Sequence, residues 1–353
     1  MNDLYLIGNG FDLAHGLKTS YNDFLLWYFN DFLKQLWTQK EFADKLVKIE
    51  CLGTRYQVPC DFISITDLIN WLEKHNYRRS SHAFFDSIIN NHTNKKWVDI
   101  EYEYYTALID IYKRFEKTGL SRDKNIDKEL DLLNNCFDSI KKKLVEYLQS
   151  IKFNSKQENS HIESILLEGT GNESQYRGDK LFVNFNYTKT LELYTSKNFP
   201  ANDNQLNIHG ELNNQSNPII FGYGDEMDPH YEKIENLNNN DFLKNIKSFG
   251  YFKTSNYQQV IRFIAGDGRR FVVKILGHSC GLSDRILLNT IFEHPNCKAI
   301  KIYYYQKSET ENDYFEKTQE ISRHFKASGK GDMRTRIVPF SHLFHWYLIT
   351  KHS

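Results

Sequence analysis

The stretch from Leu4 to Phe24, LYLIGNGFDLAHGLKTSYNDF, gives the clearest indication of the fold. Its four leading apolar residues are typical of a buried strand, and they run directly into the turn Gly8-Asn9-Gly10. Apolar residues then recur at helical spacing after Ser20, a candidate N-cap with Asp23 in the capping-box position. The stretch therefore predicts a strand, a glycine turn and a helix that begins near Ser20, with the residues between turn and helix forming a flap.

The composition is that of a globular protein of 353 residues, 40% of them apolar and 25% charged. Basic and acidic residues number 45 each, and this balance disfavours general nucleic-acid binding. The cysteines are Cys51, Cys60, Cys136, Cys280 and Cys297. They contain no CxxC pair, which disfavours a zinc ribbon, and we predict no metal site. Without an apolar leader or a bilayer-length apolar run, the sequence predicts a cytoplasmic protein with reduced thiols and no membrane association.

The chain divides by its patterns into a helical part and a strand-bearing part. Residues 41–149 carry mostly helical periodicity, clearest in residues 130–151, and the polar residues 152–178 predict a loop or boundary. Strand-like runs follow at residues 180–185, 205–208, 218–222, 271–276, 299–305 and 336–340. Strands that alternate with helices predict an α/β fold with a Rossmann-like, mostly parallel sheet and a helical insertion. We expect residues 1–40 and 175–353 to form the nucleotide-binding domain and residues 41–174 the insertion.

Four of the predicted strands end in glycine or polar residues. The four sets are Gly8-Asn9-Gly10-Phe11-Asp12, Asn186-Tyr187-Thr188, His209-Gly210, and Gly277-His278-Ser279 with Asp284 following. In an open parallel sheet, ligands bind beyond the carboxyl ends of the strands, at a topological switch point. The four sets together therefore predict one ligand site at that edge of the sheet.

The first set fits either a phosphate cradle or a tight turn. Glycines let the backbone approach a phosphate closely, and exposed N–H groups can bind it. The dinucleotide fingerprint GxGxxG is incomplete, because Leu13 stands at its third glycine. Asp12 could hold a ribose hydroxyl, although helix capping is the commoner role of such an aspartate. His15 is expected to be a loop histidine.

Asn186 and His209 are the candidates for catalysis. Asn186 could cap the helix that follows it, or it could orient a substrate hydroxyl or a water. His209 suits a general base because imidazole titrates near neutrality, and the alternative is a surface histidine in a turn. The spacing around Ser279 also matches a nucleophile elbow, but no downstream acid and base stand in a recognisable setting.

Five motifs in order resemble the AbiH family, bacterial proteins named for phage abortive infection. They are LIGNGFDLAHGLKTSYNDF, WVDIE, NFNYTKTLE, IHGE and LGHSCGLSD. The resemblance extends from the first strand to about Asp284. It implies an antiphage role, in which a phage-derived trigger or a partner protein is expected.

The strand-end sets are also distantly similar to SIR2-like proteins, which bind NAD in a Rossmann-like domain. Gly8 and Gly10 match the glycine turn of that superfamily, Asn186 its asparagine, His209 its catalytic histidine, and Gly277 and Ser279 its late Gly-x-Ser. The first set departs from the small residues usual there, Thr188 replaces the usual aspartate, and the sirtuin zinc module is missing. These departures disfavour lysine deacylation and leave NAD cleavage or NAD binding without turnover.

Two functions are therefore expected. The first is hydrolysis of NAD or a related nucleotide, which needs a pyrophosphate cradle, a group that orients ribose or water, and a base. The second is a nucleotide-binding sensor or scaffold that acts through a partner, which the loss of the usual aspartate at Thr188 favours. A nuclease is disfavoured by the neutral charge, and a homo-oligomer stays open.

Overall fold

The computed structural model describes residues 1–36, 39, 41–54, 59, 61–94, 100–117, 124–152, 158–168, 178–199 and 205–342. Cys60 and the first half of the motif WVDIE therefore lie outside the described residues. The chain forms two compact units. Unit 1 comprises Met1–Lys18, Lys152–Met227 and Ile246–Ser353, and unit 2 comprises Thr19–Ile151 and Asp228–Asn245.

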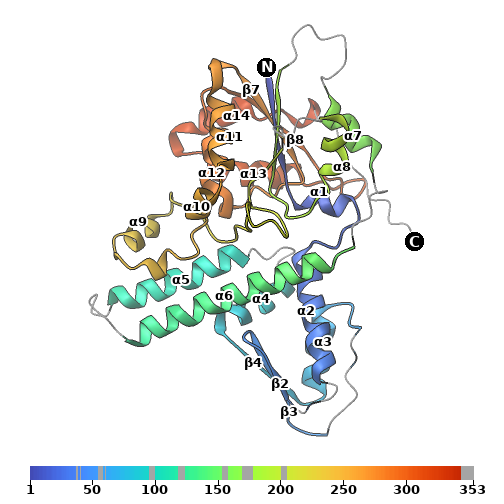
Figure 1. The fold of residues 1–353 in the computed structure, drawn as a ribbon, viewed down its shortest axis with the longest axis vertical. Coiled ribbons are helices and arrows are strands. Elements are labelled where there is room, and N and C mark those ends of the chain that lie inside the picture. The colour runs from blue at the N-terminus through green and yellow to red at the C-terminus, as the bar shows by residue number, and fades with distance from the viewer. Residues whose placement is uncertain are drawn as a thin grey trace. The chain divides into compact units, whose positions relative to one another are not determined.

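Unit 1 is built on a five-stranded sheet whose described pairings are all parallel (Figure 1). Its strands are β1 (Asn2–Ile7), β5 (Lys180–Asn184), β6 (Gln205–Asn207), β7 (Phe271–Leu276) and β8 (Cys297–Tyr303). The order is β6-β5-β1-β7-β8, so that Leu6 of the central strand lies between Val183 and Ile275. This sheet confirms the predicted Rossmann-like α/β fold.

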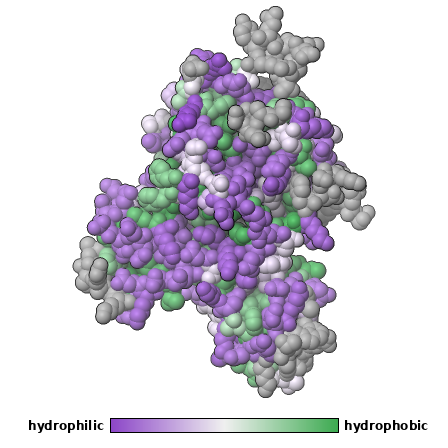
Figure 2. All heavy atoms as spheres, viewed as in Figure 1, coloured by the Kyte–Doolittle hydropathy of each residue, from purple (hydrophilic) through white to green (hydrophobic). Residues whose placement is uncertain are grey.

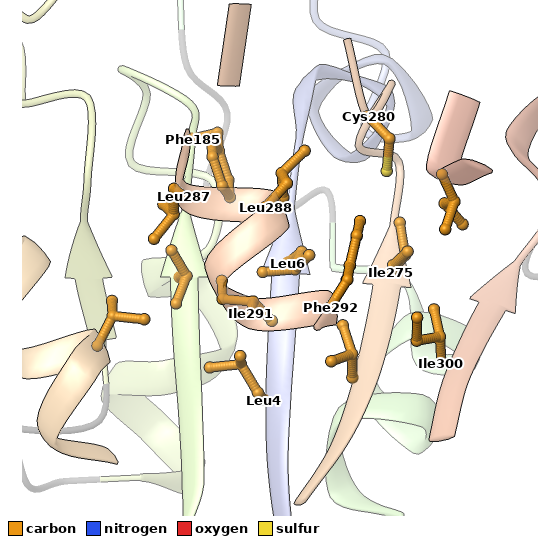
Figure 3. Packing of buried hydrophobic residues seen from close by; sticks show 14 of the residues in the cluster. Leu4, Leu6, Phe185, Ile275, Cys280, Leu287, Leu288, Ile291, Phe292 and Ile300 are labelled. Carbon is orange, nitrogen blue, oxygen red and sulfur yellow. The ribbon is translucent and has the colours of Figure 1, made fainter. Parts of the chain in front are cut away.

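Helices cover both faces of the sheet, which explains why its strands read as continuous apolar runs. One face packs against α11 (Asn256–Ala265), α12 (Arg285–Phe292) and α13 (Tyr314–His324), and Figure 3 shows α12 lying over Leu4, Leu6 and Ile275. The other face, with Tyr5 and Phe182, packs against α1 (Asn9–Ala14), α7 (Ser160–Leu167) and α8 (Glu192–Asn198). Each fully buried large apolar side chain contributes about 1.5–3 kcal/mol, so these two layers hold the carboxyl edge of the sheet in place.

A short helix begins directly after the first strand, and this corrects the predicted flap. Gly8 is the N-cap of α1, which contains Phe11 to Ala14 of the predicted flap. Six residues are too few for helical periodicity to be recognised in the sequence. The helix predicted to begin near Ser20 is α2 (Tyr21–Leu36). Its capping box is confirmed, because Asp23 N–H donates to Ser20 Oγ at 3.2 Å and Ser20 N–H donates to Asp23 Oδ2 at 3.3 Å.

Unit 2 is mainly helical, as predicted. Its helices are α2, α3 (Ile65–Lys74), α4 (Ala83–Asn94), α5 (Ile100–Lys117), α6 (Lys124–Ser150) and α9 (Pro229–Glu235). It also contains a three-stranded antiparallel sheet of β2 (Glu41–Ala43), β3 (Val47–Cys51) and β4 (Tyr77–Ser81), which the mostly helical pattern of residues 41–149 did not predict. Asp44 Oδ1 accepts the N–H groups of Leu46 and Val47 at 2.8 and 3.0 Å, and this turn starts the hairpin.

The observed units differ from the expected domain boundaries at residues 40 and 174. Helix α2 belongs to unit 2, because its apolar face packs with α3 and α6. Helix α7 lies in the segment expected to be a loop, and it belongs to unit 1 because Ile162 and Ile165 pack beneath Tyr5. Asn159 caps α7 by accepting the N–H groups of His161 and Ile162. Residues 228–245 also belong to unit 2, although the sequence placed them with the sheet.

Two predicted strands do not form. Residues 218–222 run beside His209, whose carbonyl accepts Ile220 N–H at 2.8 Å, but they make no ladder. The segment after α14 (Lys330–Arg336) makes a single parallel bridge between Ile337 and Ile300. Isolated bridges of this kind lack the repeated hydrogen bonds that define a strand.

On the face drawn in Figure 2, hydrophilic residues predominate and apolar residues form scattered patches. Exposed large apolar side chains include Ile63, Phe252 and Phe315. None of the helices described above combines the length and the apolar character needed to cross a bilayer.

Candidate functional site

The candidate site lies in unit 1, where β1 and β7 end side by side. The strands that follow β1 along the chain, β5 and β6, lie on one side of it, whereas β7 and β8 lie on the other. The connections after β1 and β7 therefore leave toward opposite faces, which makes this point the topological switch of the sheet. All four predicted strand-end sets follow strands of this parallel sheet, so they share its carboxyl edge.

Gly8 and Gly277 allow the ends of β1 and β7 to touch. A Cβ on Gly8 would lie 2.4 Å from His278 Cα, and one on Gly277, whose φ is +68°, would lie 2.4 Å from the Phe11 nitrogen. Three N–H groups of this turn have backbone partners. Gly8 N–H donates to Leu276 O at 3.1 Å, Gly10 N–H to Gly277 O at 2.9 Å, and Phe11 N–H to Gly8 O at 2.8 Å. Of the two alternatives for this turn, the geometry favours close backbone packing over a phosphate cradle.

Asp12 and the predicted set after β5 form a buried polar cluster. Thr188 Oγ1 donates to Asp12 Oδ2 at 2.6 Å, and Asn186 Nδ2 donates to both Gly8 O and Asp12 Oδ1, at 3.1 and 3.3 Å. Burial raises the pKa of Asp12 to about 6, against the hydroxyl hydrogen bonds from Thr188 and Thr190, which lower it. Asn186 Oδ1 accepts no hydrogen bond from a described residue, so it is the amide atom open to a ligand.

Asp284 brings three of the remaining site residues together. Its Oδ1 accepts hydrogen bonds from His209 Nε2 and Lys247 Nζ, each at 2.9 Å, and its Oδ2 lies 3.5 Å from His278 Nε2. Burial alone would raise the pKa of Asp284, but the Lys247 ammonium and His209 hold it well below its usual range. Asp284 is therefore a buried carboxylate that orients a histidine pair. Lys247 is the first residue of α10 (Lys247–Gly250).

The hydrogen bonds assign the protons on both histidines. Cys280 N–H donates to His278 Nδ1 at 3.0 Å, so the neutral His278 ring carries its proton on Nε2, facing Asp284. Burial lowers the pKa of His278, against the hydrogen bond to Asp284. His209 likewise donates from Nε2 to Asp284, and no described residue bonds to its Nδ1. The ring of Phe185 packs between the two imidazoles, with centroids 5.1 Å from His209 and 4.0 Å from His278.

The loop after β7 is held by a third histidine. His324 of α13 donates from Nε2 to Cys280 O at 2.8 Å, and burial lowers the pKa of His324 to about 4, so this ring is neutral. Burial raises the pKa of the Cys280 thiol to about 12, which makes it a poor nucleophile. Ser279 is exposed, and no described hydrogen bond joins it to a histidine or carboxylate. The nucleophile-elbow interpretation gains no support from this geometry.

Phe11, His15 and Tyr187 have structural partners. Phe11 is buried, and its ring packs 4.7 Å from His15. His15 lies in the turn after α1, as expected, but it is buried and has partners: it donates from Nδ1 to Phe11 O at 2.6 Å and accepts from Tyr194 Oη at 2.5 Å. Tyr187 Oη donates to Ile220 O at 3.1 Å, and its ring lies 6.4 Å from His209.

Sequence reasoning missed Lys247 and Phe185. Lys247 follows no strand and stands among other lysines in a polar segment, so no local pattern distinguishes it. Phe185 reads as the last apolar residue of β5. Only its place in the sequence, between the end of the strand and Asn186, hints at a role in the site.

The arrangement can activate a water or a hydroxyl at one sheet edge. His209 Nδ1 is a proton acceptor oriented through Asp284, while Asn186 Oδ1 and Asp12 accept hydrogen bonds from hydroxyl groups. Across the described part of the chain, no three His, Cys, Asp or Glu side chains gather in an arrangement that could hold a metal ion. Asn9 and Gly10 are half-buried beside this cluster, at the start of α1.

The fold and this cluster define a Rossmann-like α/β protein with a His–Asp site at the switch point of its sheet. A family model described as bacteriophage abortive infection AbiH matches residues 4–306. The chain therefore belongs to the AbiH family, which supports a function in phage abortive infection. No curated protein and no solved structure matches the chain significantly.

Proposed function

We propose that this AbiH-family protein hydrolyses the N-glycosidic bond of NAD or of a related nucleotide during abortive infection. The observation that carries the proposal is the buried His209–Asp284 hydrogen bond, which leaves His209 Nδ1 without a described partner. Asn186 Oδ1 and the Asp12 carboxylate share the same edge of the sheet. The distant similarity to SIR2-like proteins supports NAD as the ligand.

The reaction makes modest demands on these side chains. Water attacks the anomeric carbon while the C–N bond breaks, and the bonding pair passes to the pyridinium nitrogen, so nicotinamide leaves neutral. His209 Nδ1 accepts the proton of the water and releases it to solvent, which leaves nicotinamide, ADP-ribose and a proton as products. The transition state resembles an oxocarbenium ion, and hydroxyl contacts to Asn186 and Asp12 would hold the ribose in position.

The experiment is a nicotinamide-release assay. Purified protein is incubated with NAD, with and without phage lysate, and nicotinamide is separated by chromatography. We expect release by wild type and a loss of about 100-fold or more in His209→Gln, a typical contribution of a general base. His161→Gln, which alters an exposed histidine of α7, is the matched control. Equal release by wild type and His209→Gln under every condition would overturn the assignment.

A second candidate is a nucleotide sensor that binds without turnover. The side chains of His209 and Asp284 are each only 8% exposed, which favours a site that needs a partner or trigger before a substrate can reach it. Calorimetric titration with ADP-ribose and NAD separates the candidates. Binding of both ligands with no nicotinamide release, in the presence of phage lysate, would support the sensor.

A further inference from the structure

The Asp284 carboxylate carries a contact that general-base chemistry does not require. A His–Asp pair needs only the carboxylate that orients the imidazole. Here Lys247 Nζ shares Oδ1 with His209 Nε2, each at 2.9 Å, and the Lys247 side chain is 1% exposed. A buried lysine is costly unless it is paired, so its presence calls for an explanation.

We propose that Lys247 is a positioning residue: it holds and neutralises the Asp284 carboxylate that also orients His209, and so disfavours a second positive charge on that imidazole. This inference rests on the proposed function only for its consequence in catalysis. Its physical content, the coupling of Lys247 to His209 through Asp284, holds for the protein without substrate.

The charge balance of the cluster supports the proposal. One carboxylate and one ammonium leave no net charge, so a proton added to His209 would create a second buried cation. The two nitrogens lie within about 6 Å of each other because each lies 2.9 Å from the same oxygen. Their repulsion opposes a positive charge on the imidazole. Without Lys247, the carboxylate would instead favour the imidazolium.

The other ionisable groups around the pair do not replace Lys247. Arg285 adjoins Asp284 in sequence but its Nη1 pairs with Asp225 at 2.8 Å. His278 faces Asp284 Oδ2, and its pKa is lowered by burial and, to a smaller extent, by Lys317 of α13 and Lys247. The neutral His324 is engaged with Cys280 O, and Tyr187 Oη with Ile220 O.

The test is a titration of the histidine rings in the substrate-free, full-length protein. Rings labelled with ¹³C are followed by NMR from pH 5 to 9, and His209 is assigned by the signal missing in His209→Gln. In Lys247→Met we expect the midpoint for the His209 ring to move to higher pH, because the neighbouring positive charge is removed. Lys247→Arg should restore most of the difference, because it keeps the positive charge. Lys253→Met, at an exposed position of the next turn, is the control and should change nothing.

Two outcomes separate this inference from a purely structural role. Lys247→Met combined with Asp284→Asn removes both charges, so the midpoint should fall back to or below that of wild type. Should Lys247→Met not fold, Lys247→Gln makes the same charge change and keeps a polar side chain. An unchanged midpoint in the folded neutral variant, or equal midpoints in the single and double variants, would overturn the proposal. Absence of NAD cleavage would overturn the proposed function and leave this result standing.

Discussion

Replacing Asp12 with asparagine should stabilise the protein at neutral pH while it impairs the site. Asp12 is buried, and its pKa rises from 3.8 to about 6 on folding. That difference corresponds to about 3 kcal/mol of unfolding free energy, because one pKa unit is about 1.4 kcal/mol. Asparagine has nearly the same shape and cannot ionise, so the variant avoids this cost.

Proton linkage gives the direction in which the stability difference changes with pH. The folded protein binds a proton at Asp12 more tightly than the unfolded chain, so the stability of wild type falls as pH rises from about 4 to 6. The stability advantage of Asp12→Asn should therefore grow by about 1–2 kcal/mol at pH 5 and about 3 kcal/mol above pH 7. Loss of the hydrogen bond that Thr188 donates to the carboxylate costs about 1–2 kcal/mol. This cost lowers the stability of Asp12→Asn equally at every pH, so the change of the stability difference with pH stays the same.

Urea unfolding followed by circular dichroism from pH 4 to 8 measures this difference. Asp179→Asn, at an exposed ion pair with Arg269 in the same unit, removes the same charge from the surface and serves as the control. A difference between Asp12→Asn and wild type that stays flat across pH 4 to 7 would refute the reasoning, because the cost would then not arise from ionisation.

Three further predictions concern packing, a hydrogen bond and an ion pair in unit 1. Gly277→Ala should lower the unfolding free energy by about 2 kcal/mol or more, since its Cβ would meet Phe11 N at a positive φ; Gly331→Ala, in open space on α14, should change it by less than about 1 kcal/mol, and equal effects would contradict the close approach. His324→Leu should lower the unfolding free energy, measured by urea unfolding, by about 1–3 kcal/mol, because Cys280 O loses its hydrogen-bond donor. An unchanged unfolding free energy would show that this hydrogen bond does not stabilise the loop after β7. Lys274→Met should lower the unfolding free energy by about 1–3 kcal/mol, because it leaves the partly exposed carboxylate of Asp3 without its ammonium partner; a thermal melt like that of wild type would contradict this role.

The strands of unit 1 could be predicted because burial on both faces makes them continuously apolar. Leu4 to Ile7 and the run that ends at Leu276 carry this signal in a few residues each, and the sets that follow them locate one edge of the sheet. The hairpin of β2 and β3 could not be predicted from the sequence, because in this short stretch only Val47 and Ile49 alternate with charged residues. Helix α1 escaped because six residues cannot display a helical period.

The site could be predicted only where a strand end marks it. His209, Asn186, Asp12 and Asp284 were found by this rule, and the structure joins them in two hydrogen-bonded groups. Lys247 could not be found, because its role depends on the tertiary contact that brings α10 to Asp284. The sequence also could not show why the strand ends carry glycines. A bound phosphate and a closely packed neighbouring backbone both require a residue without a Cβ at these positions.

The most direct measurement is NAD cleavage in ¹⁸O-labelled water, analysed by mass spectrometry of the products. Hydrolysis through His209 predicts one ¹⁸O in each ADP-ribose, one unlabelled nicotinamide per NAD consumed, and negligible product from His209→Gln. Unlabelled ADP-ribose added in parallel corrects for spontaneous exchange. NAD that survives intact under every activating condition, or that His209→Gln consumes as fast as wild type, would contradict the proposed chemistry.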